Sequence, residues 1–363
     1  MDITIIGLPQ SGKTTVFNAV TKGAIKIASY ANAPNVGVVK VPDSRLIELG
    51  KIYNPKRVIQ AEITYTDLPS DYEKSANAIL SRTYLNNLQK ADALLLVSRG
   101  FEDDSIVHSK GTIDVFRDIR TLLDELVLVD LEILERRLVK LDENKKGINP
   151  EERQKILIET DFLMKLRKSL EDGINISEQN YSDQETRLLS GFQFLTAKPL
   201  IIVANIGEEQ IHSINNIQID LDEKFSANRI STSAICGSLE MDLIQLDLQE
   251  QIEFRKSLQL DSQSGLQRMI KLSYDALDLI SFLTVGEDEV RAWPITKGTI
   301  AVKAAGKIHS DLEKGFIRGE VISYDNLIKS GSLSVGRTQG LLRQEGKEYV
   351  LEDGDIMHVL FNN

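Results

Sequence analysis

Short apolar runs recur along the N-terminal part of the chain, separated by stretches with helical spacing. The most apolar run is 91–97 (ADALLLV), and similar runs occupy 2–6, 61–66, 199–205 and 229–234. A strand that is apolar on both faces is typical of a parallel sheet, because helices cover both sides of such a sheet. The pattern therefore predicts an α/β domain with a mainly parallel sheet.

The pattern changes between 118 and about 170, where charged positions surround leucines spaced three and four residues apart. A break at 147–150 (GINP) divides this stretch, and a second helical pattern begins at Glu151. The spacing predicts two antiparallel helices that form an arm, inserted into the α/β domain over residues 118–196. Leucines packed between the two helices explain the pattern; an arm that binds a partner is the alternative.

From residue 280 onward the composition changes again, to short strands separated by glycine-rich turns and one helical segment at 301–307. This pattern predicts a separate α+β domain of about eighty residues, an ordinary size for such a unit. The expected organisation is therefore a first domain made of 1–117 and 197–278, the helical arm, and a C-terminal domain at 279–363.

Composition narrows the class of protein. The 363 residues suffice for two or three domains, and no apolar run approaches the roughly 18 residues of a membrane span. One cysteine, Cys236, excludes an internal disulfide framework, and the four histidines lack the spacing of a structural metal site. A net charge of −11 argues against nucleic-acid binding through bulk charge. We expect a cytoplasmic protein with no membrane segment and no DNA partner.

Candidate chemistry lies in the segment that follows the first predicted strand. Residues 7–14 (GLPQSGKT) fit the pattern G-x-x-x-x-G-K-[ST], and helical spacing begins directly afterwards. Strand, glycine-rich loop and helix together predict a phosphate site, and a chance turn before a helix is the alternative. Lys13 is expected to contact the β- and γ-phosphates. The expected nucleotide contacts of this loop are Gly7, Pro9, Gln10, Ser11, Gly12, Lys13, Thr14 and Thr15.

A magnesium site is predicted beside this loop. The strand at 61–66 is followed by Asp67, the position at which such a domain holds Mg²⁺ through a water, and the Thr14 hydroxyl is expected to bind the ion directly. Aspartate also favours turns, so a turn or a helix cap is the alternative interpretation of Asp67.

A base-recognition site is predicted at the end of the strand at 199–205. The strand ends on Asn205-Ile206-Gly207-Glu208, where GTPases carry the tetrad N-K-x-D that recognises guanine. Isoleucine here replaces the lysine and a longer glutamate replaces the aspartate, which weakens discrimination for guanine and favours ATP, with GTP as a second substrate. A plain turn is the alternative. The expected base contacts are Asn205, Ile206, Glu208, Ser233 and Ala234.

Taken together, these features resemble the YchF/Obg-like ATPase family of the P-loop GTPase class. The resemblance rests on 7–15, on 34–46 (PNVGVVKVPDSRL), on 101–108 (FEDDSIVH), and on two C-terminal stretches, 282–293 and 308–318. It implies a Ras-like P-loop domain, an inserted arm that is a coiled coil, and a C-terminal β-grasp (TGS) domain.

The resemblance also implies an activity and a partner. Proteins of this family hydrolyse ATP at least as readily as GTP, associate with ribosomes and carry the base motif N-x-x-E, which Asn205 and Glu208 match. A histidine in the loop that matches 101–108 positions the attacking water, which makes His108 a catalytic candidate beside Lys13. The C-terminal domain is expected to contact rRNA or a ribosomal protein; packing on the nucleotide domain is its alternative role.

Departures from the family pattern lie where the γ-phosphate is sensed. Gln10 replaces an asparagine, Ala31 stands at the switch threonine, Ser70 replaces a glycine, and Asp71 replaces a hydrophobic residue. By its position, Asp71 is a further candidate for orienting the attacking water. The sequence therefore predicts slow, Mg²⁺-dependent hydrolysis of ATP, or of GTP, coupled to ribosome or translation-related binding. The alternative is a nucleotide-binding interaction module with little or no hydrolysis.

Overall fold

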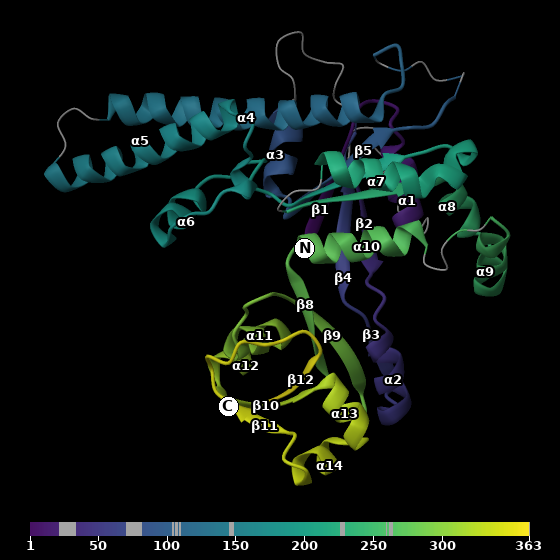
Figure 1. Ribbon diagram of the computed structural model, residues 1–363. Helices are drawn as coiled ribbons and strands as arrows, with labels where there is room; N and C mark the ends of the chain where they lie inside the picture. Colours follow the sequence, from purple (N-terminus) through teal and green to yellow (C-terminus); the bar gives the residue numbers. More distant parts are fainter. Residues whose placement is uncertain are drawn as a thin grey trace. The chain divides into compact units, whose positions relative to one another are not determined.

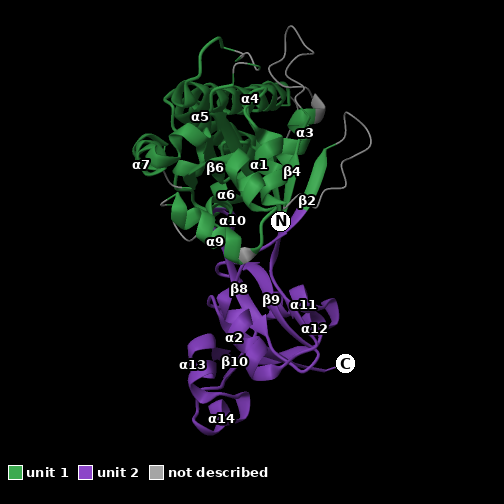
Figure 2. Cartoon of the chain, turned by 90° about the vertical axis from the view of Figure 1, so that its right-hand side faces the viewer, with its two compact units in different colours: residues 1–37, 64–269 green, residues 38–63, 270–363 purple. Residues whose placement is uncertain are grey.

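The computed structural model of the chain (Figure 1) describes residues 1–21, 34–69, 82–103, 105, 108, 110–144, 149–225, 229–258, 260 and 264–362. Three positions discussed above, Ala31, Ser70 and Asp71, lie outside the described residues. The chain forms two compact units (Figure 2): unit 1 contains 1–37 and 64–269, and unit 2 contains 38–63 and 270–363. Among the described residues, no helix is long and apolar enough to cross a membrane.

A six-stranded sheet forms the centre of the fold in which the sequence predicts a nucleotide site. Its strands are β1 (Asp2–Ile6), β2 (Asn35–Lys40), β4 (Glu62–Asp67), β5 (Ala93–Arg99), β6 (Leu200–Asn205) and β7 (Ile230–Ile235). They lie in the order β2-β4-β1-β5-β6-β7, and the pairings β1–β4, β1–β5, β5–β6 and β6–β7 are parallel. Every residue of β5 and β6 is buried, which confirms the predicted parallel sheet.

Helices pack on this sheet through one apolar core cluster. Leu88 of α3 (Arg82–Lys90), Leu122 of α4 (Val115–Glu143) and Leu221 of α7 (Ile214–Phe225) share that cluster with Leu94 and Ile202 of the central strands. Outside the arm, the helices of this fold are α1 (Lys13–Val20), α3 (Arg82–Lys90), η3 (Glu208–Ser213), α7 (Ile214–Phe225), α8 (Gly237–Leu243), α9 (Leu248–Ser257) and α10 (Gly265–Ala276).

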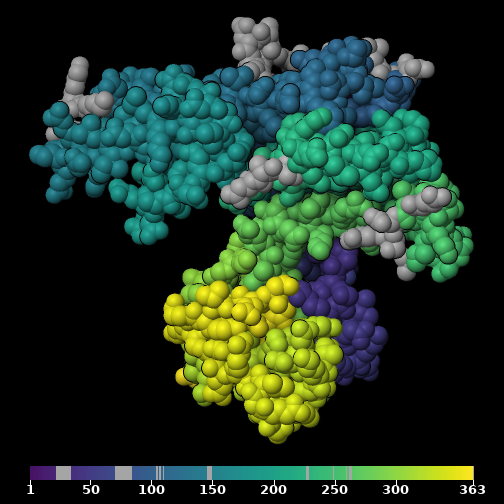
Figure 3. Space-filling view, in the orientation of Figure 1, coloured from purple at the N-terminus to yellow at the C-terminus, as the bar shows by residue number. Residues whose placement is uncertain are grey.

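The arm that the leucine spacing predicts is present as α4 (Val115–Glu143) and α5 (Pro150–Glu171), and it projects from the rest of unit 1 (Figure 3). Leu134 and Leu141 of α4 pack against Phe162, Leu163 and Leu166 of α5 in a cluster of their own. The Asp114 and Asn149 side chains cap the two helix starts, as such residues commonly do. The short helices η2 (Ile176–Glu178) and α6 (Asp183–Leu189) lead back to the sheet.

One buried carboxylate joins the arm to the sheet. Asp130, in the middle of α4, has no exposed surface and accepts hydrogen bonds from the Leu195 N–H (2.8 Å), the Thr196 N–H (2.8 Å) and the Thr196 hydroxyl (2.7 Å). Leu195 and Thr196 lie shortly before β6, so this contact holds α4 beside the start of a central strand. Burial raises the pKa of Asp130 to about 6, against the opposing effect of these hydrogen bonds.

A second six-stranded sheet, in the order β11-β10-β12-β8-β9-β3, forms unit 2. β8 and β9 make an antiparallel hairpin, and β12 lies parallel to β8 and antiparallel to β10. Ala301, Ala304 and Ala305 of α11 share one core cluster with Phe282 and Phe316 from the sheet, in the arrangement of the expected β-grasp fold. The elements after α10 are β8 (Leu279–Thr284), β9 (Glu289–Thr296), α11 (Ala301–Ile308), α12 (Ser310–Lys314), β10 (Phe316–Ser323), α13 (Tyr324–Ser330), α14 (Leu333–Thr338), β11 (Arg343–Glu345) and β12 (Asp355–Phe361).

Unit 2 also contains residues 38–63, which the sequence analysis assigns to the nucleotide-binding domain. This segment carries α2 (Ser44–Tyr53) and β3 (Arg57–Ile59), and β3 pairs in parallel with β9. Lys56 and Asp288, which form an ion pair at 2.7 Å, are 232 positions apart in the sequence. No local pattern of residues reports a pairing over such a separation.

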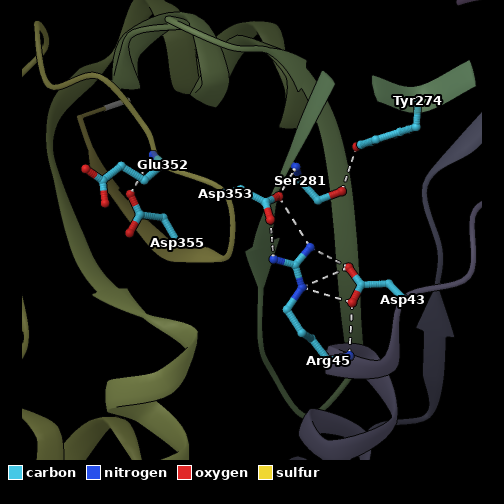
Figure 4. A network of polar contacts seen from close by, with 7 residues as sticks. All are labelled: Asp43, Arg45, Tyr274, Ser281, Glu352, Asp353 and Asp355. Atoms are coloured by element: carbon cyan, nitrogen blue, oxygen red, sulfur yellow. Dashed lines mark hydrogen bonds and ion pairs between the residues drawn. The ribbon is translucent and has the colours of Figure 1, made fainter. Parts of the chain in front are cut away.

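Arg45 connects the same segment to the C-terminal strands (Figure 4). Its guanidinium donates from Nε and Nη2 to Asp43, at 2.9 and 2.8 Å, and from Nη1 to Asp353 at 2.8 Å. Asp353 also accepts the Ser281 N–H at 2.8 Å, and the Ser281 hydroxyl lies 2.7 Å from that of Tyr274. Forked, charge-assisted bonds of this kind are stronger than neutral ones. Unit 2 is therefore built from two separate stretches of chain.

Candidate functional site

The phosphate loop lies where β1 ends, and α1 begins within it at Lys13. Two of its glycines are required by geometry. Gly12 has a φ of +84°, in the left-handed region that favours glycine, and a Cβ on Gly7 would collide with the Val97 carbonyl. The loop therefore turns tightly enough to bring the N-terminus of α1 beside the ends of the central strands, where helix N–H groups favour phosphate.

Lys13 is enclosed by this loop. Its side chain is buried, and its ammonium donates to the Gly7 carbonyl at 3.1 Å and the Leu8 carbonyl at 3.0 Å. Burial lowers the pKa of Lys13 to about 8, although the charge of Asp67 acts in the opposite direction. A buried cation held by neutral carbonyls alone is costly, and phosphate oxygens would compensate that charge.

Thr14 and Asp67 meet beside Lys13, as the sequence analysis expects of magnesium ligands. The Thr14 hydroxyl donates to Asp67 Oδ2 at 2.8 Å, and the Asn35 amide donates to the same oxygen at 3.4 Å. The other carboxylate oxygen, Oδ1, is buried and has no hydrogen-bond partner among the described residues. Burial also raises the pKa of Asp67, against the hydrogen bonds from Thr14 and Asn35.

These donors fit Mg²⁺, which prefers oxygen ligands and usually keeps several waters beside one or two protein groups. The Thr14 hydroxyl and the Asp67 carboxylate, with its unpartnered Oδ1, could provide two oxygen ligands to an ion whose remaining ligands are phosphates and waters. No group of three or more histidine, cysteine, aspartate or glutamate side chains that could hold a metal occurs among the described residues. An ion at Thr14 and Asp67 would therefore depend on the nucleotide for its other ligands.

Asn205, at the end of β6, joins the phosphate loop to the start of α8. Its amide donates to the Ser11 carbonyl at 3.2 Å, and its oxygen accepts the Gly237 N–H at 3.0 Å. The sequence analysis missed Gly237. A Cβ there would lie 2.9 Å from Asn205 Oδ1 and 3.3 Å from Thr15 Cγ2, so only glycine permits this approach. The available signal was a glycine just after a predicted strand.

The other residues predicted at the base site occupy varied environments. Ile206 belongs to the apolar core, and its N–H donates to the Ile235 carbonyl at 2.8 Å. Glu208 is exposed at the first position of η3, whereas Ser233 is fully buried and its hydroxyl has no partner among the described residues.

The Ala234 N–H differs from expectation. The sequence analysis places it near the base, but it donates to the Gln218 side chain of α7 at 2.9 Å. The reason is that β7 is an edge strand that pairs with β6 alone among the described strands, so N–H groups on its outer side bond to other elements.

A further residue that the sequence analysis missed is Arg99, at the end of β5. It is buried, donates to the Phe101 carbonyl at 3.1 Å and the Asp103 carbonyl at 3.3 Å, and places its guanidinium 4.7 Å from the centre of the Phe101 ring. Phe101 in turn lies against Gly12 of the phosphate loop. The available signal for this buried arginine was a basic residue at the end of a mainly apolar strand.

His108 is paired with the arm in this structure. Its Nε2 lies 2.8 Å from Asp118 Oδ2, and its Nδ1 accepts the Lys110 N–H at 3.1 Å. Both side chains of the pair are buried. The structure thus brings Lys13, Thr14, Asp67 and Asn205 together, while it holds His108 against the first turn of α4.

Comparison with known families gives two matches. Residues 279–362 match YchF-GTPase_C, a family described as a protein of unknown function. Residues 2–129 match MMR_HSR1, described as a 50S ribosome-binding GTPase.

Individual relatives match almost the whole chain. It is 34% identical to the ribosome-binding ATPase YchF of Bacillus subtilis and 36% identical to that of Haemophilus influenzae, over 99% of this chain and 98% of each relative. The solved structure of the Schizosaccharomyces pombe YchF GTPase matches with a TM-score of 0.85 and 32% identity, over 99% of this chain and 97% of that one.

Proposed function

Because the chain belongs to the YchF family, we propose that it binds ATP with Mg²⁺ at the loop 7–15 and hydrolyses it slowly, in a cycle coupled to ribosome binding. The observation that carries the proposal is the arrangement of Lys13, Thr14 and Asp67 at this loop. An enclosed Lys13 ammonium stands beside a Thr14 hydroxyl that is bonded to a buried, half-satisfied Asp67 carboxylate.

In the proposed reaction, Lys13 and the N–H groups of the loop stabilise the charge that develops on the transferred phosphoryl group. Thr14 and Asp67 hold Mg²⁺, which supplies further charge neutralisation when it is bound. His108 and Asp71 are the candidates for orienting the attacking water. The Asn205 bridge keeps the base end of the site in register with the phosphate end.

We propose ATP as the preferred nucleotide, with GTP as a second substrate. Asn205 and Glu208 carry the base motif, with Ile206 and Ser233 as further candidates, whereas the Ala234 N–H is bonded to Gln218. The exposed Glu208 is longer than the aspartate that pairs with guanine, and the neighbouring Ile206 side chain is buried in the core. A guanine-specific site has a lysine stem where this chain has Ile206, and a shorter aspartate carboxylate where this chain has Glu208.

The ribosome is the proposed partner, because the bacterial relatives are described as ribosome-binding ATPases. We propose the C-terminal domain (279–363) and the arm (118–196) as the parts that reach it, with the remaining chain as the nucleotide domain. A cytoplasmic setting follows from such a partner.

A nucleotide-binding module with little or no hydrolysis is the second candidate. The observation that favours it is the sequence around the γ-phosphate, where Ala31, Ser70 and Asp71 replace residues that the family pattern uses for sensing. Nucleotide binding without turnover would then control the interaction with the partner.

Phosphate release separates these two functions. We expect release from ATP in Mg²⁺, none in EDTA, and a loss of about a hundredfold or more in Asp67→Asn, because the metal loses its carboxylate. Glu62→Gln, at the exposed other end of β4, is the matched control and is expected to keep full activity. Bound nucleotide without any release would support the second candidate, and a hundredfold preference for GTP would overturn the choice of ATP.

Cosedimentation with ribosomes tests the partner. We expect the chain to sediment with ribosomes more strongly in ATP and Mg²⁺ than without nucleotide, because the cycle couples the two ligands. Lys13→Ala is expected to lose the nucleotide dependence. Equal absence of the protein from the ribosomal pellet under both conditions would contradict a ribosomal partner.

A further inference from the structure

The pairing of His108 with Asp118 involves groups that are hidden from solvent. The His108 side chain is 5% exposed and the Asp118 side chain 2% exposed, and Nε2 lies 2.8 Å from Oδ2. Asp118 Oδ2 has no hydrogen-bond partner among the described residues, so the 2.8 Å contact is a close approach of His108 Nε2 to the carboxylate and not an aligned hydrogen bond. A buried carboxylate oxygen that lacks an aligned donor is costly, so a polar ring nitrogen at this distance favours the pairing.

The contacts of His108 determine its chemistry. Nδ1 accepts the Lys110 N–H, so this nitrogen carries no proton, and the proton of the neutral ring is on Nε2, beside Asp118. One nitrogen therefore accepts from the backbone and the other faces a carboxylate. In this state the imidazole has no nitrogen with which to accept a hydrogen bond or a proton from a water.

Asp118 is held in place from its other side. The Arg117 guanidinium donates to Asp118 Oδ1 from Nε at 3.0 Å and from Nη2 at 2.9 Å. Arg117 also donates to the Thr112 hydroxyl at 2.9 Å and to the Thr112 carbonyl at 2.6 Å. Asp118 lies in the first turn of α4, where the helix N-terminus stabilises a negative charge.

We propose that Asp118 is a positioning residue that stores His108 in an inactive state, and that His108 serves the nucleotide site only after leaving Asp118. This inference rests on the proposed hydrolysis, for which His108 is the candidate that orients water. Asp118 belongs to the arm helix α4, so the proposed storage of His108 links the arm to the nucleotide site.

Asp118→Asn breaks the pairing with almost no change in volume. The two Arg117 donors favour the amide oxygen at the Oδ1 position, which turns the amide NH₂ group toward the Nε2 proton of His108. Two donors then face each other, and the stored state is lost. Asp124→Asn, at an exposed position of the same helix, is the matched control.

Carbethoxylation by diethyl pyrocarbonate measures the release of His108 without any nucleotide. His309 is 64% exposed in its side chain and serves as the internal reference in the same digest. In the wild-type chain we expect His108 to react at least about tenfold more slowly than His309, because the buried His108 ring must first leave Asp118 and become accessible to the reagent. In Asp118→Asn the ratio is expected to approach one, and in Asp124→Asn it should stay at the wild-type value. Peptide mass spectrometry gives both rates.

Kinetics then connect release to the reaction. We expect Asp118→Asn to raise kcat by about fivefold with KM unchanged, because a larger fraction of molecules has His108 available. The double variant Asp118→Asn/His108→Ala is expected to fall to the rate of His108→Ala alone. That loss shows that the effect passes through His108.

Each possible result of these experiments tests a different part of the proposal. An unchanged carbethoxylation ratio in Asp118→Asn overturns the stored state, whatever the hydrolysis rate. A released His108 with an unchanged or lower kcat overturns the link between storage and reaction. Absence of hydrolysis in every variant overturns the proposed function, while the carbethoxylation result still decides whether Asp118 holds His108. Thermal unfolding monitored by circular dichroism verifies that each variant is folded.

Discussion

Lys13→Ala is expected to abolish phosphate release and to weaken ATP binding by about a hundredfold or more, because the phosphates lose the positive charge that Lys13 supplies. The side chain is enclosed by the loop, and its ammonium donates to the Gly7 and Leu8 carbonyls. Fluorescent-nucleotide titration measures the affinity. Lys51→Ala, at an exposed lysine of α2, is expected to leave it unchanged, and ATP binding of wild-type strength in Lys13→Ala would contradict the phosphate site.

The buried charge of Lys13 lowers the free energy of unfolding of the protein without nucleotide. Its folded pKa of about 8 is below the ordinary 10.5, so the folded chain binds fewer protons than the unfolded chain between these values. The destabilisation is complete below pH 8 and disappears as the pH rises toward 10.5. Lys13→Met is therefore expected to stabilise the unliganded protein at pH 7 by roughly 1 kcal/mol, and this gain is expected to shrink above pH 8. Urea unfolding at pH 7 and pH 10 measures the difference.

Asp130→Ala is expected to destabilise unit 1 by about 3 kcal/mol, because three donors lose their common buried acceptor. The donors are the Leu195 N–H and both the N–H and the hydroxyl of Thr196. Urea unfolding followed by far-UV circular dichroism measures the loss. Asp124→Asn, exposed on the same helix, is expected to change stability by less than about 0.5 kcal/mol. An unfolding curve of Asp130→Ala identical to that of the wild type would contradict this role.

The pH dependence gives a second measurement on Asp130. Burial raises its folded pKa to about 6, above the ordinary 3.8, so the folded chain binds the proton more readily. The stability of the wild-type chain relative to Asp130→Asn, which does not titrate there, is therefore expected to increase as the pH falls from 6 to 4. Trp293, the only tryptophan in the chain, lies in β9 of unit 2, and its fluorescence follows that unit separately.

The phosphate site shows how much local sequence can predict. Gly7, Gly12 and Lys13 act within one loop, and strand and helix flank that loop directly in the sequence. Gly7 and Gly12 permit the tight backbone turn of this loop, so the local pattern predicts the turn, while the nucleotide contacts of the loop stay a prediction. The same holds for the buried strand β5, whose unbroken apolar run requires cover on both faces.

Other contacts of the site lie beyond local patterns. Asn205 donates to the Ser11 carbonyl, 194 positions away, and accepts the N–H of Gly237, 32 positions away; the glycine itself is visible in the sequence, but its approach to Asn205 is not. The Ala234 N–H points to Gln218 because β7 is an edge strand, and edge positions follow from the order of the sheet. Strand order depends on which distant segments pack best, which local propensity does not encode.

The sequence by itself determined the phosphate loop, the parallel sheet, the helical arm and the family, because each depends on residues close together in the chain. Only the tertiary structure decided that 38–63 complete unit 2 through Arg45 and β3, and that His108 lies against Asp118. Long-range strand pairing and buried ion pairs are selected by the complete packed fold, in which the free energy of desolvation depends on every neighbour.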